Sequence, residues 1–314
     1  MDIEQSQIQS DSQLCEQFLN HIKHEKKLFW PSIAKTYENN PALFLELSSL
    51  MLKWAHNIIN EHFFETLTDG YSFFVTDVNK SQIRYEKIGQ YENKSYSEVY
   101  ESVYANPEHM SLYHWGVYVT TFAWEHHLKI YDFFKDKFIS KLVGLDGHIL
   151  ELGSGSGIWG MLVMNQLKMC DITGIDISKT SIDLAKYMAK YNGMLERCQY
   201  IVDDALVFTD DVEYDAVISC FLMEHLEDPQ TLLNNMSKNL KPRGYSFLTC
   251  ALTAAEIDHI FEFKKESEVI LMAEKAGFRV ISSFSSAPSS YPLNYKYLPR
   301  SMALVLQKKE NDIW

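Results

Sequence analysis

The second half of the chain alternates short apolar runs with amphipathic segments. Apolar runs typical of strands buried on both faces occur at residues 148–152, 172–175, 198–202 and 214–220. A segment of helical character follows the first of these runs, at residues 158–167. This alternation predicts an α/β domain with parallel strands.

The first 140 residues show no such alternation, and several segments follow helical spacing instead. Asn40 and Pro41 suit a helix cap and the first turn of the helix after it. A second helix is expected from Ser97 to just before Pro107, because proline disfavours helical geometry in the residue that precedes it. Residues 73–85 indicate a short hairpin.

These patterns predict two domains. Residues 1–140 are expected to form a mostly α-helical N-terminal domain, and residues 141–314 an α/β domain. With 314 residues, of which 46% are hydrophobic, the chain is long enough for both.

Glycines at alternate positions follow the apolar run at residues 148–152. Gly153, Gly155 and Gly157 lie where a strand gives way to a helix, and glycine lets the backbone approach a ligand and adopt a positive φ angle. Asp176 ends the next apolar run, about 20 residues after the loop, where a carboxylate can accept hydrogen bonds from ribose hydroxyls. These features predict a site for a nucleotide-like cofactor.

Two kinds of cofactor suit such a loop. Residues 155–160 also satisfy the G-x-G-x-x-G pattern of dinucleotide binding, which carries little weight alone. Glu151 would repel a pyrophosphate but would suit a ligand with an ammonium group, and only one set of alternating strands and helices follows the loop. These two features disfavour a dinucleotide cofactor, but a nucleotide-dependent oxidoreductase is kept as an alternative.

From about residue 145 to residue 308, the chain resembles the class I methyltransferases that use S-adenosylmethionine (SAM). The resemblance rests on ordered motifs: Glu151-x-Gly153-x-Gly155-x-Gly157, the acid Asp176, the pair Asp204-Ala205, and residues 221–229, which are similar to the family's E-H-L-x-D-P segment. It implies a Rossmann-like sheet of seven strands, with SAM as cofactor and S-adenosylhomocysteine (SAH) as product. The residues expected to bind SAM are Glu151, Gly153, Gly155, Gly157, Asp176, Ile177, Asp204, Ala205 and Phe221.

Four residues are candidates for the chemistry of the methyl acceptor. His225 follows the fourth predicted strand, and His259 could form an oriented acid–base pair with Asp258. Tyr113 and His114 lie in a stretch that resembles the H-x-G-y segment of small-molecule methyltransferases. The alternative for each is a packing or capping role, and no metal site is predicted.

Charge and composition narrow the class of partner. The formal net charge of −13 would repel a nucleic-acid backbone. Five cysteines without C-x-x-C spacing indicate a reducing compartment, and the chain shows neither a signal-peptide pattern nor an apolar run long enough to span a membrane. We therefore expect a cytoplasmic methyltransferase with a small organic acceptor, no membrane partner, and the methylated atom and oligomeric state left open. A non-catalytic SAM-binding subunit with a sealed cleft is the other alternative.

Overall fold

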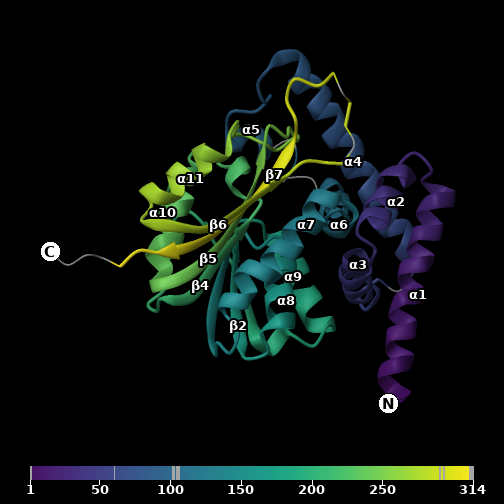
Figure 1. Cartoon of the computed structure of the whole chain (residues 1–314), viewed down its shortest axis with the longest axis horizontal. Helices are drawn as coiled ribbons and strands as arrows, with labels where there is room; N and C mark the ends of the chain where they lie inside the picture. The colour runs from purple at the N-terminus through teal and green to yellow at the C-terminus, as the bar shows by residue number, and fades with distance from the viewer. Residues whose placement is uncertain are drawn as a thin grey trace.

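The computed structural model describes residues 2–59, 61–100, 103, 107–289, 291–292 and 294–310. Helices occupy the first part of the chain: α1 (Asp2–Glu25), α2 (Trp30–Asn39), α3 (Pro41–His56), α4 (Phe63–Ile88), α5 (Tyr96–Val99), α6 (Pro107–Ala123) and α7 (Glu125–Phe133). A π-helical turn, η2 (Phe134–Phe138), and a 3-10 turn, η3 (Ile139–Lys141), lead from α7 toward the sheet. Helices α1, α2 and α3 lie together on one side of the sheet (Figure 1).

The helix expected after Asn40 is present as α3, which begins at Pro41. The helix expected from Ser97 to just before Pro107 is described as α5, and Tyr100 and Val103 beyond it are π-helical; residues 101–102 and 104–106 lie outside the described part of the chain. A capping box at Ser95 begins α5.

The hairpin predicted at residues 73–85 is wrong, since these residues belong to α4. Gly70 and Gly116 allow α4 to approach α6 closely: a Cβ atom added to Gly116 would lie 2.3 Å from the Phe74 Cβ atom. Phe74 and Tyr85 are both buried, at helical rather than strand spacing. Close packing between two helices therefore determines the structure of this segment.

Seven strands form one sheet in the order β3-β2-β1-β4-β5-β7-β6. The strands are β1 (Gly147–Leu152), β2 (Cys170–Asp176), β3 (Cys198–Val202), β4 (Tyr214–Cys220), β5 (Leu240–Leu252), β6 (Phe278–Ser286) and β7 (Arg300–Lys308). Strands β1 to β5 are parallel, and β7 runs antiparallel to both β5 and β6. This is the sheet of the class I methyltransferase fold, so the predicted fold class is confirmed.

Helices cover both faces of the sheet (Figure 1). Ile149 packs with α7, α8 (Ile158–Gln166) and α9 (Lys179–Tyr191), whereas the next residue, Leu150, packs with α10 (Pro229–Asn239) and α11 (Glu266–Lys275). Successive side chains of a strand point to opposite faces, which explains the continuous apolar runs. The hydrophobic core that contains Ile149 extends into α1 and α3, so the helical part and the sheet share one core. Whether residues 1–140 and 141–314 are separate domains stays a prediction.

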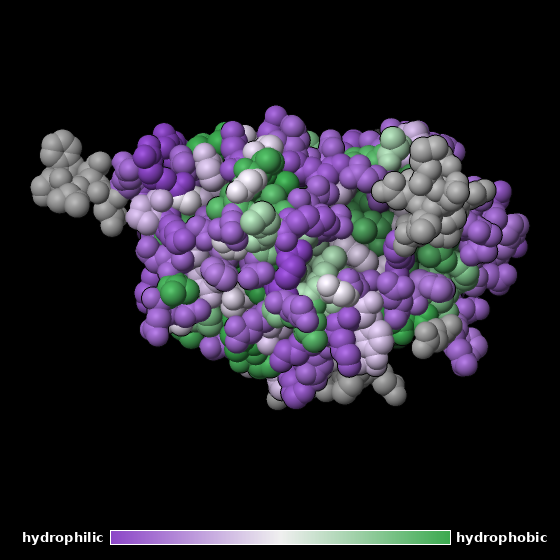
Figure 2. Space-filling view, turned by 90° about the horizontal axis from the view of Figure 1, so that it is seen from below, coloured by the Kyte–Doolittle hydropathy of each residue, from purple (hydrophilic) through white to green (hydrophobic). Residues whose placement is uncertain are grey.

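Strand β1 lies between β2 and β4, so the chain leaves β1 toward one edge of the sheet and later returns to the other side of β1. Ligands of open α/β sheets bind at the carboxyl ends of the strands where the strand order reverses in this way. The face shown in Figure 2 is largely hydrophilic, with apolar residues in scattered groups. Within the described ranges, no helix is both long and apolar enough to cross a membrane.

Candidate functional site

A cavity of about 1300 Å³ lies at the carboxyl ends of the central strands. Its wall includes the loop after β1, the ends of β2 and β4, the segment after β5, and one side of α4 and α6. Pockets for a single small molecule usually measure about 300–1000 Å³, so this one has room for two molecules.

The three glycines of the loop have different surroundings. Gly155 lines the cavity with a φ angle of +51°, and a Cβ atom added there would have no other atom within 4 Å. An added Cβ atom at Gly153 would lie 2.6 Å from the Leu222 side chain, and one at Gly157 would lie 2.6 Å from the Tyr200 hydroxyl. Gly155 is thus the glycine that leaves open space for a ligand, while the other two allow close packing.

Asp176 lines the cavity at the end of β2 and holds the glycine loop. Its Oδ2 atom accepts a hydrogen bond from the Gly155 N–H group at 2.8 Å, and its Oδ1 atom accepts one from the Ser178 N–H group at 2.8 Å. Burial raises the pKa of this carboxyl, and the two backbone hydrogen bonds oppose that shift. Ile177, the next residue, also lines the cavity and is 52% exposed, which offers an apolar surface to a flat ring.

Asp204, Ala205 and Phe221 also line the cavity, so the structure brings them to the same wall as Asp176. The Oδ1 atom of Asp204 accepts a hydrogen bond from the Leu206 N–H group at 2.8 Å. Phe221 has a φ angle of +54°, a conformation that costs energy for any residue with a side chain and that is common at functional sites.

The structure does not bring Glu151 to the cavity wall. Its side chain is 1% exposed, and its Oε2 atom accepts a hydrogen bond from the Gly160 N–H group at 3.1 Å. Burial raises the pKa of Glu151 well above its usual value. The expected contact between Glu151 and an ammonium group of the ligand therefore stays a prediction, and Glu151 now contacts the helix after the loop.

An imidazole–carboxylate cluster, made of Glu224, His225, Glu256, Asp258 and His259, lies after the ends of β4 and β5. The Nδ1 atom of His225 lies 3.4 Å from the Asp258 Oδ2 atom, and the Nε2 atom of His259 lies 3.7 Å from the Glu256 Oε2 atom. The two imidazole rings meet edge to face at 4.9 Å. The structure brings Asp258 close to both histidines: it lies beside His225, and one ligand atom from each of Glu256, Asp258 and His259 lies within 4.8 Å of the others. The acid–base pairing of Asp258 with His259 stays a prediction.

Burial shifts the charge states of this cluster. It raises the pKa of Glu224 to about 7 and lowers that of His259 to about 3. The Oε1 atom of Glu224 accepts a hydrogen bond from the Ala251 N–H group at 3.1 Å, whereas the buried Oε2 atom has no hydrogen-bond partner among the described residues. Across the described ranges, no lysine or arginine forms an ion pair with Glu224 or Glu256.

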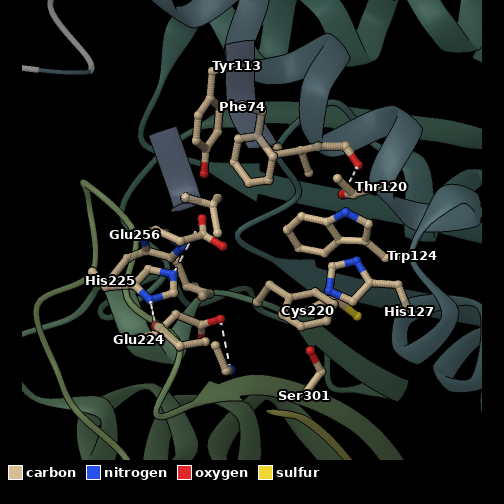
Figure 3. A pocket seen from close by; sticks show the side chains of 18 of the residues that line it. Phe74, Tyr113, Thr120, Trp124, His127, Cys220, Glu224, His225, Glu256 and Ser301 are labelled. Carbon is tan, nitrogen blue, oxygen red and sulfur yellow. Dashed lines mark hydrogen bonds and ion pairs between the residues drawn. The ribbon is translucent and has the colours of Figure 1, made fainter. Parts of the chain in front are cut away.

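An aromatic wall faces this cluster across the cavity. Phe74, Trp124, His127 and Phe221 form a series with ring centroids 5.8, 5.0 and 4.8 Å apart. Figure 3 shows Trp124 and His127 on the side of the pocket opposite Glu224, His225 and Glu256. Burial lowers the pKa of His127 well below its usual value, so this ring is neutral.

Tyr113 and His114 line the cavity from α6, but His114 binds away from the cluster. Its Nε2 atom lies 3.2 Å from the Ser181 Oγ atom in α9, and burial lowers its pKa to about 4. Tyr118, on another side of the helix, is 1% exposed and donates a hydrogen bond to the Met51 carbonyl. Helix α6 thus contributes one face to the cavity and another to the core.

Sequence reasoning did not select Glu224 or Glu256 as site residues. Glu224 stood inside the E-H-L segment, so the signal was present, but the residue was assigned no role. Glu256 had only its proximity to His259 along the chain to suggest a role.

The sequence of the chain is similar to those of known methyltransferases. Residues 150–246 match a family described as a methyltransferase domain. A ubiquinone biosynthesis O-methyltransferase of Coxiella burnetii is 26% identical over 166 residues, which covers 46% of this chain and 69% of that protein. An uncharacterized methyltransferase of Schizosaccharomyces pombe is 28% identical over 175 residues, which covers 53% of this chain and 57% of that protein.

Solved structures show a more distant likeness. One is the O-methyltransferase of a trans-AT polyketide synthase multienzyme of Brevibacillus brevis, in complex with SAH. It has a TM-score of 0.46 and 13% sequence identity, and the match covers 56% of this chain and 70% of that one.

Proposed function

The chain belongs to the class I SAM-dependent methyltransferases, and on that premise we propose that it transfers a methyl group to a hydroxyl of a small organic acceptor. The observation that carries the proposal is a single cavity of about 1300 Å³ that contains both the glycine loop and the imidazole–carboxylate cluster. One part of this cavity suits a cofactor, and the other suits an acceptor whose hydroxyl proton must be removed.

The residues of the cofactor part fit SAM. Gly155 leaves space for a ligand, and the Oγ atom of Ser154, buried at the cavity wall, has no hydrogen-bond partner among the described residues. Asp176 still has lone pairs for ribose hydroxyls, since each carboxylate oxygen can accept more than one hydrogen bond. The exposed Ile177 and the neighbouring Asp204 would contact adenine.

When bound, SAM supplies an electrophilic methyl group attached to a sulfonium. The chain's own residues must hold the acceptor oxygen in line, about 3 Å away, and exclude water. The aromatic rings of Phe221 and Trp124 can stabilise a positive charge through cation–π attraction. His127, which contacts both rings, is neutral and therefore does not repel that charge.

Oxygen is the proposed methylated atom for two reasons. The Coxiella burnetii relative is named an O-methyltransferase. A hydroxyl must also lose its proton when it is methylated, and the cluster offers imidazole and carboxylate groups that can accept it. The net charge of −13 makes a small molecule a better acceptor than nucleic acid, and five free cysteines fit the expected cytoplasmic location.

The two alternatives are less well supported. A nucleotide-dependent oxidoreductase does not explain the match of residues 150–246 to a methyltransferase domain. A non-catalytic subunit was expected to have a sealed or filled cleft, whereas this cavity retains room for an acceptor.

Binding of SAH to Asp176→Asn tests the cofactor part of the proposal. Hydrogen bonds to a charged group contribute about 1.5–3 kcal/mol, so calorimetry should show an affinity roughly 10- to 150-fold weaker than that of the wild type. Asp183→Asn is the control, because Asp183 is exposed on α9, where it pairs with Lys179, and does not line the cavity. Equal SAH affinities in all three proteins would contradict the assignment.

Methyl transfer is tested with isotopically labelled SAM and a panel of small phenols, alcohols and amines. We expect label in a hydroxyl-bearing acceptor and none with the Asp176→Asn variant at low SAM concentration. Label only in amine acceptors would disprove O-methylation while leaving the family assignment intact.

A further inference from the structure

We propose that the imidazole–carboxylate cluster binds one divalent metal ion, with Glu224, His225 and His259 as ligands and Glu256 as a fourth donor. The inference concerns residues whose positions along the chain show no metal-binding motif. It differs from the expectation of no metal site.

The spacing of the donor atoms suits a single ion. One ligand atom from each of Glu224, His225 and His259 lies within 4.8 Å of the others. The Nε2 atom of His259 and the Oε2 atom of Glu256 are 3.7 Å apart, too far for a hydrogen bond. Two ligands about 2.1 Å from one tetrahedral zinc ion lie roughly 3.4 Å apart, so a small movement would bring Glu256 and His259 to the spacing of two ligands. Glu256 also forms a second group with Asp258 and His259, in which one ligand atom of each lies within 4.8 Å of the others.

The orientation of both imidazoles gives a second argument. The Nδ1 atom of His259 lies 2.7 Å from the Ala254 carbonyl oxygen, and the Nδ1 atom of His225 lies 3.2 Å from the Asp258 carbonyl oxygen. Each Nδ1–H group can therefore donate to a carbonyl, which leaves the other ring nitrogen with a lone pair. Metal-binding histidines are usually held in this way, by a hydrogen bond from the second nitrogen to a carbonyl or carboxylate.

Charge and burial give a third argument. Glu224 is 1% exposed, and its Oε2 atom has no hydrogen-bond partner in the described part of the chain. Neither Glu224 nor Glu256 pairs with a lysine or arginine within those same residues. An ionised carboxylate that is buried without a cation is costly, so a divalent ion beside Glu224 and the partly exposed Glu256 would stabilise the ionised form of both.

Two imidazoles and two carboxylates favour zinc or another first-row transition metal, because Mg²⁺ and Ca²⁺ prefer oxygen ligands alone. Glu224, His225, Glu256 and His259 line the cavity, so a water or acceptor oxygen could occupy a remaining coordination position. The role of the ion, which rests on the proposed function, would be to hold the acceptor oxygen beside the methyl donor.

The test uses Co²⁺ as the probe, because its visible absorption reports coordination by protein ligands. The full chain is freed of metal with a chelator and titrated with Co²⁺, and each sample is also titrated with SAH. We expect one Co²⁺ per chain in the wild type and at least a 10-fold weaker affinity in His259→Ala and in Glu256→Gln. His148→Ala is the control, since His148 is exposed at the start of β1, at the other end of the strand from the cavity.

Glu256→Gln keeps the size of a side chain at the cavity wall, so it guards against a variant that fails to fold, and circular dichroism checks each protein. Failure of the folded, metal-free wild type to bind Co²⁺ would overturn the proposal, as would wild-type affinity in both cluster variants. Binding of Co²⁺ without binding of SAH would uphold the metal site and contradict the proposed function. Binding of SAH without binding of Co²⁺ would contradict the metal site and leave the proposed function intact.

Discussion

Replacement of Gly155 by valine is expected to abolish cofactor binding while leaving the fold intact. Gly155 has a φ angle of +51°, and an added Cβ atom would enter space where no other atom lies within 4 Å. A valine side chain would therefore meet no protein atom at its base and would project toward the space proposed for the ligand. Its effect on binding should exceed its effect on packing.

The conformational cost can be separated from the loss of ligand space. Gly193, which follows α9, also has a positive φ angle, +68°, and also has no atom within 4 Å of an added Cβ atom. Gly193 is exposed and does not line the cavity. A residue with a side chain pays about 1–2 kcal/mol in the left-handed region, so Gly155→Val and Gly193→Val should lose similar stability.

The binding effect should differ sharply between the two variants. We expect SAH affinity in Gly155→Val to fall by at least 100-fold, or about 2.7 kcal/mol, because the side chain blocks close approach of the ligand to the backbone. Gly193→Val should bind SAH as the wild type does. Isothermal calorimetry measures the affinities, and urea unfolding measures the stabilities. Wild-type SAH affinity in a folded Gly155→Val protein would refute the assignment of the loop.

Three further predictions concern other parts of the site. Burial raises the pKa of Glu151, so its ionised form opposes folding as the pH rises above 4.5, and Glu151→Gln should melt at a higher temperature than the wild type at pH 8. Unchanged SAH affinity in this variant would contradict the predicted contact between Glu151 and the cofactor. Burial alone would raise the pKa of Glu125, but hydrogen bonds from Lys129, Ser289 and Asn39 outweigh burial and lower this pKa from 4.5 to about 2. The wild type should therefore be more stable than Glu125→Gln by about 1.5–3 kcal/mol above pH 4.5. Unfolding experiments should show this difference disappear as the pH falls toward 2. SAH should increase protection from hydrogen exchange in residues 109–118 as well as in the glycine loop, and protection of the loop alone would contradict closure of the pocket by α6.

The strands were the most predictable part of the fold. Strands β3 and β4 span residues 198–202 and 214–220, as the apolar runs predicted. Parallel strands covered on both faces must be apolar at nearly every position, so their limits are visible in the sequence. The fifth strand, β5, begins at Leu240 and includes polar residues near its start, so its limits are less visible in the sequence. Arg243, with a φ angle of +63°, marks a local irregularity there.

Helix α4 was misinterpreted because its cause is not local. The aromatic residues near Phe74 have the composition of a strand, but Gly70 and Gly116 permit a close approach between α4 and α6. No periodicity within the segment reveals a partner that lies more than forty positions away along the chain. Glu151 illustrates a related limit. The motif predicted that Glu151 would contact the cofactor, but it did not predict that the side chain would be buried and would accept a hydrogen bond from the Gly160 N–H group.

The imidazole–carboxylate cluster was less predictable than the strands but more predictable than α4. Its residues come together because of the strand order, which spacing along the chain does not reveal. Strands β4 and β5 are parallel neighbours, with Cys220 opposite Thr249, so the segments that follow them leave the sheet side by side. The N–H groups of Ile260 and Phe261 donate to the Glu224 carbonyl at 2.8 and 3.0 Å, which joins these segments directly. Residues 224–225 and 256–259 are therefore brought together by the fold once β5 is placed beside β4. A strand order taken from the family resemblance would predict this proximity, whereas the Asp258–His259 pair was inferred from adjacency alone.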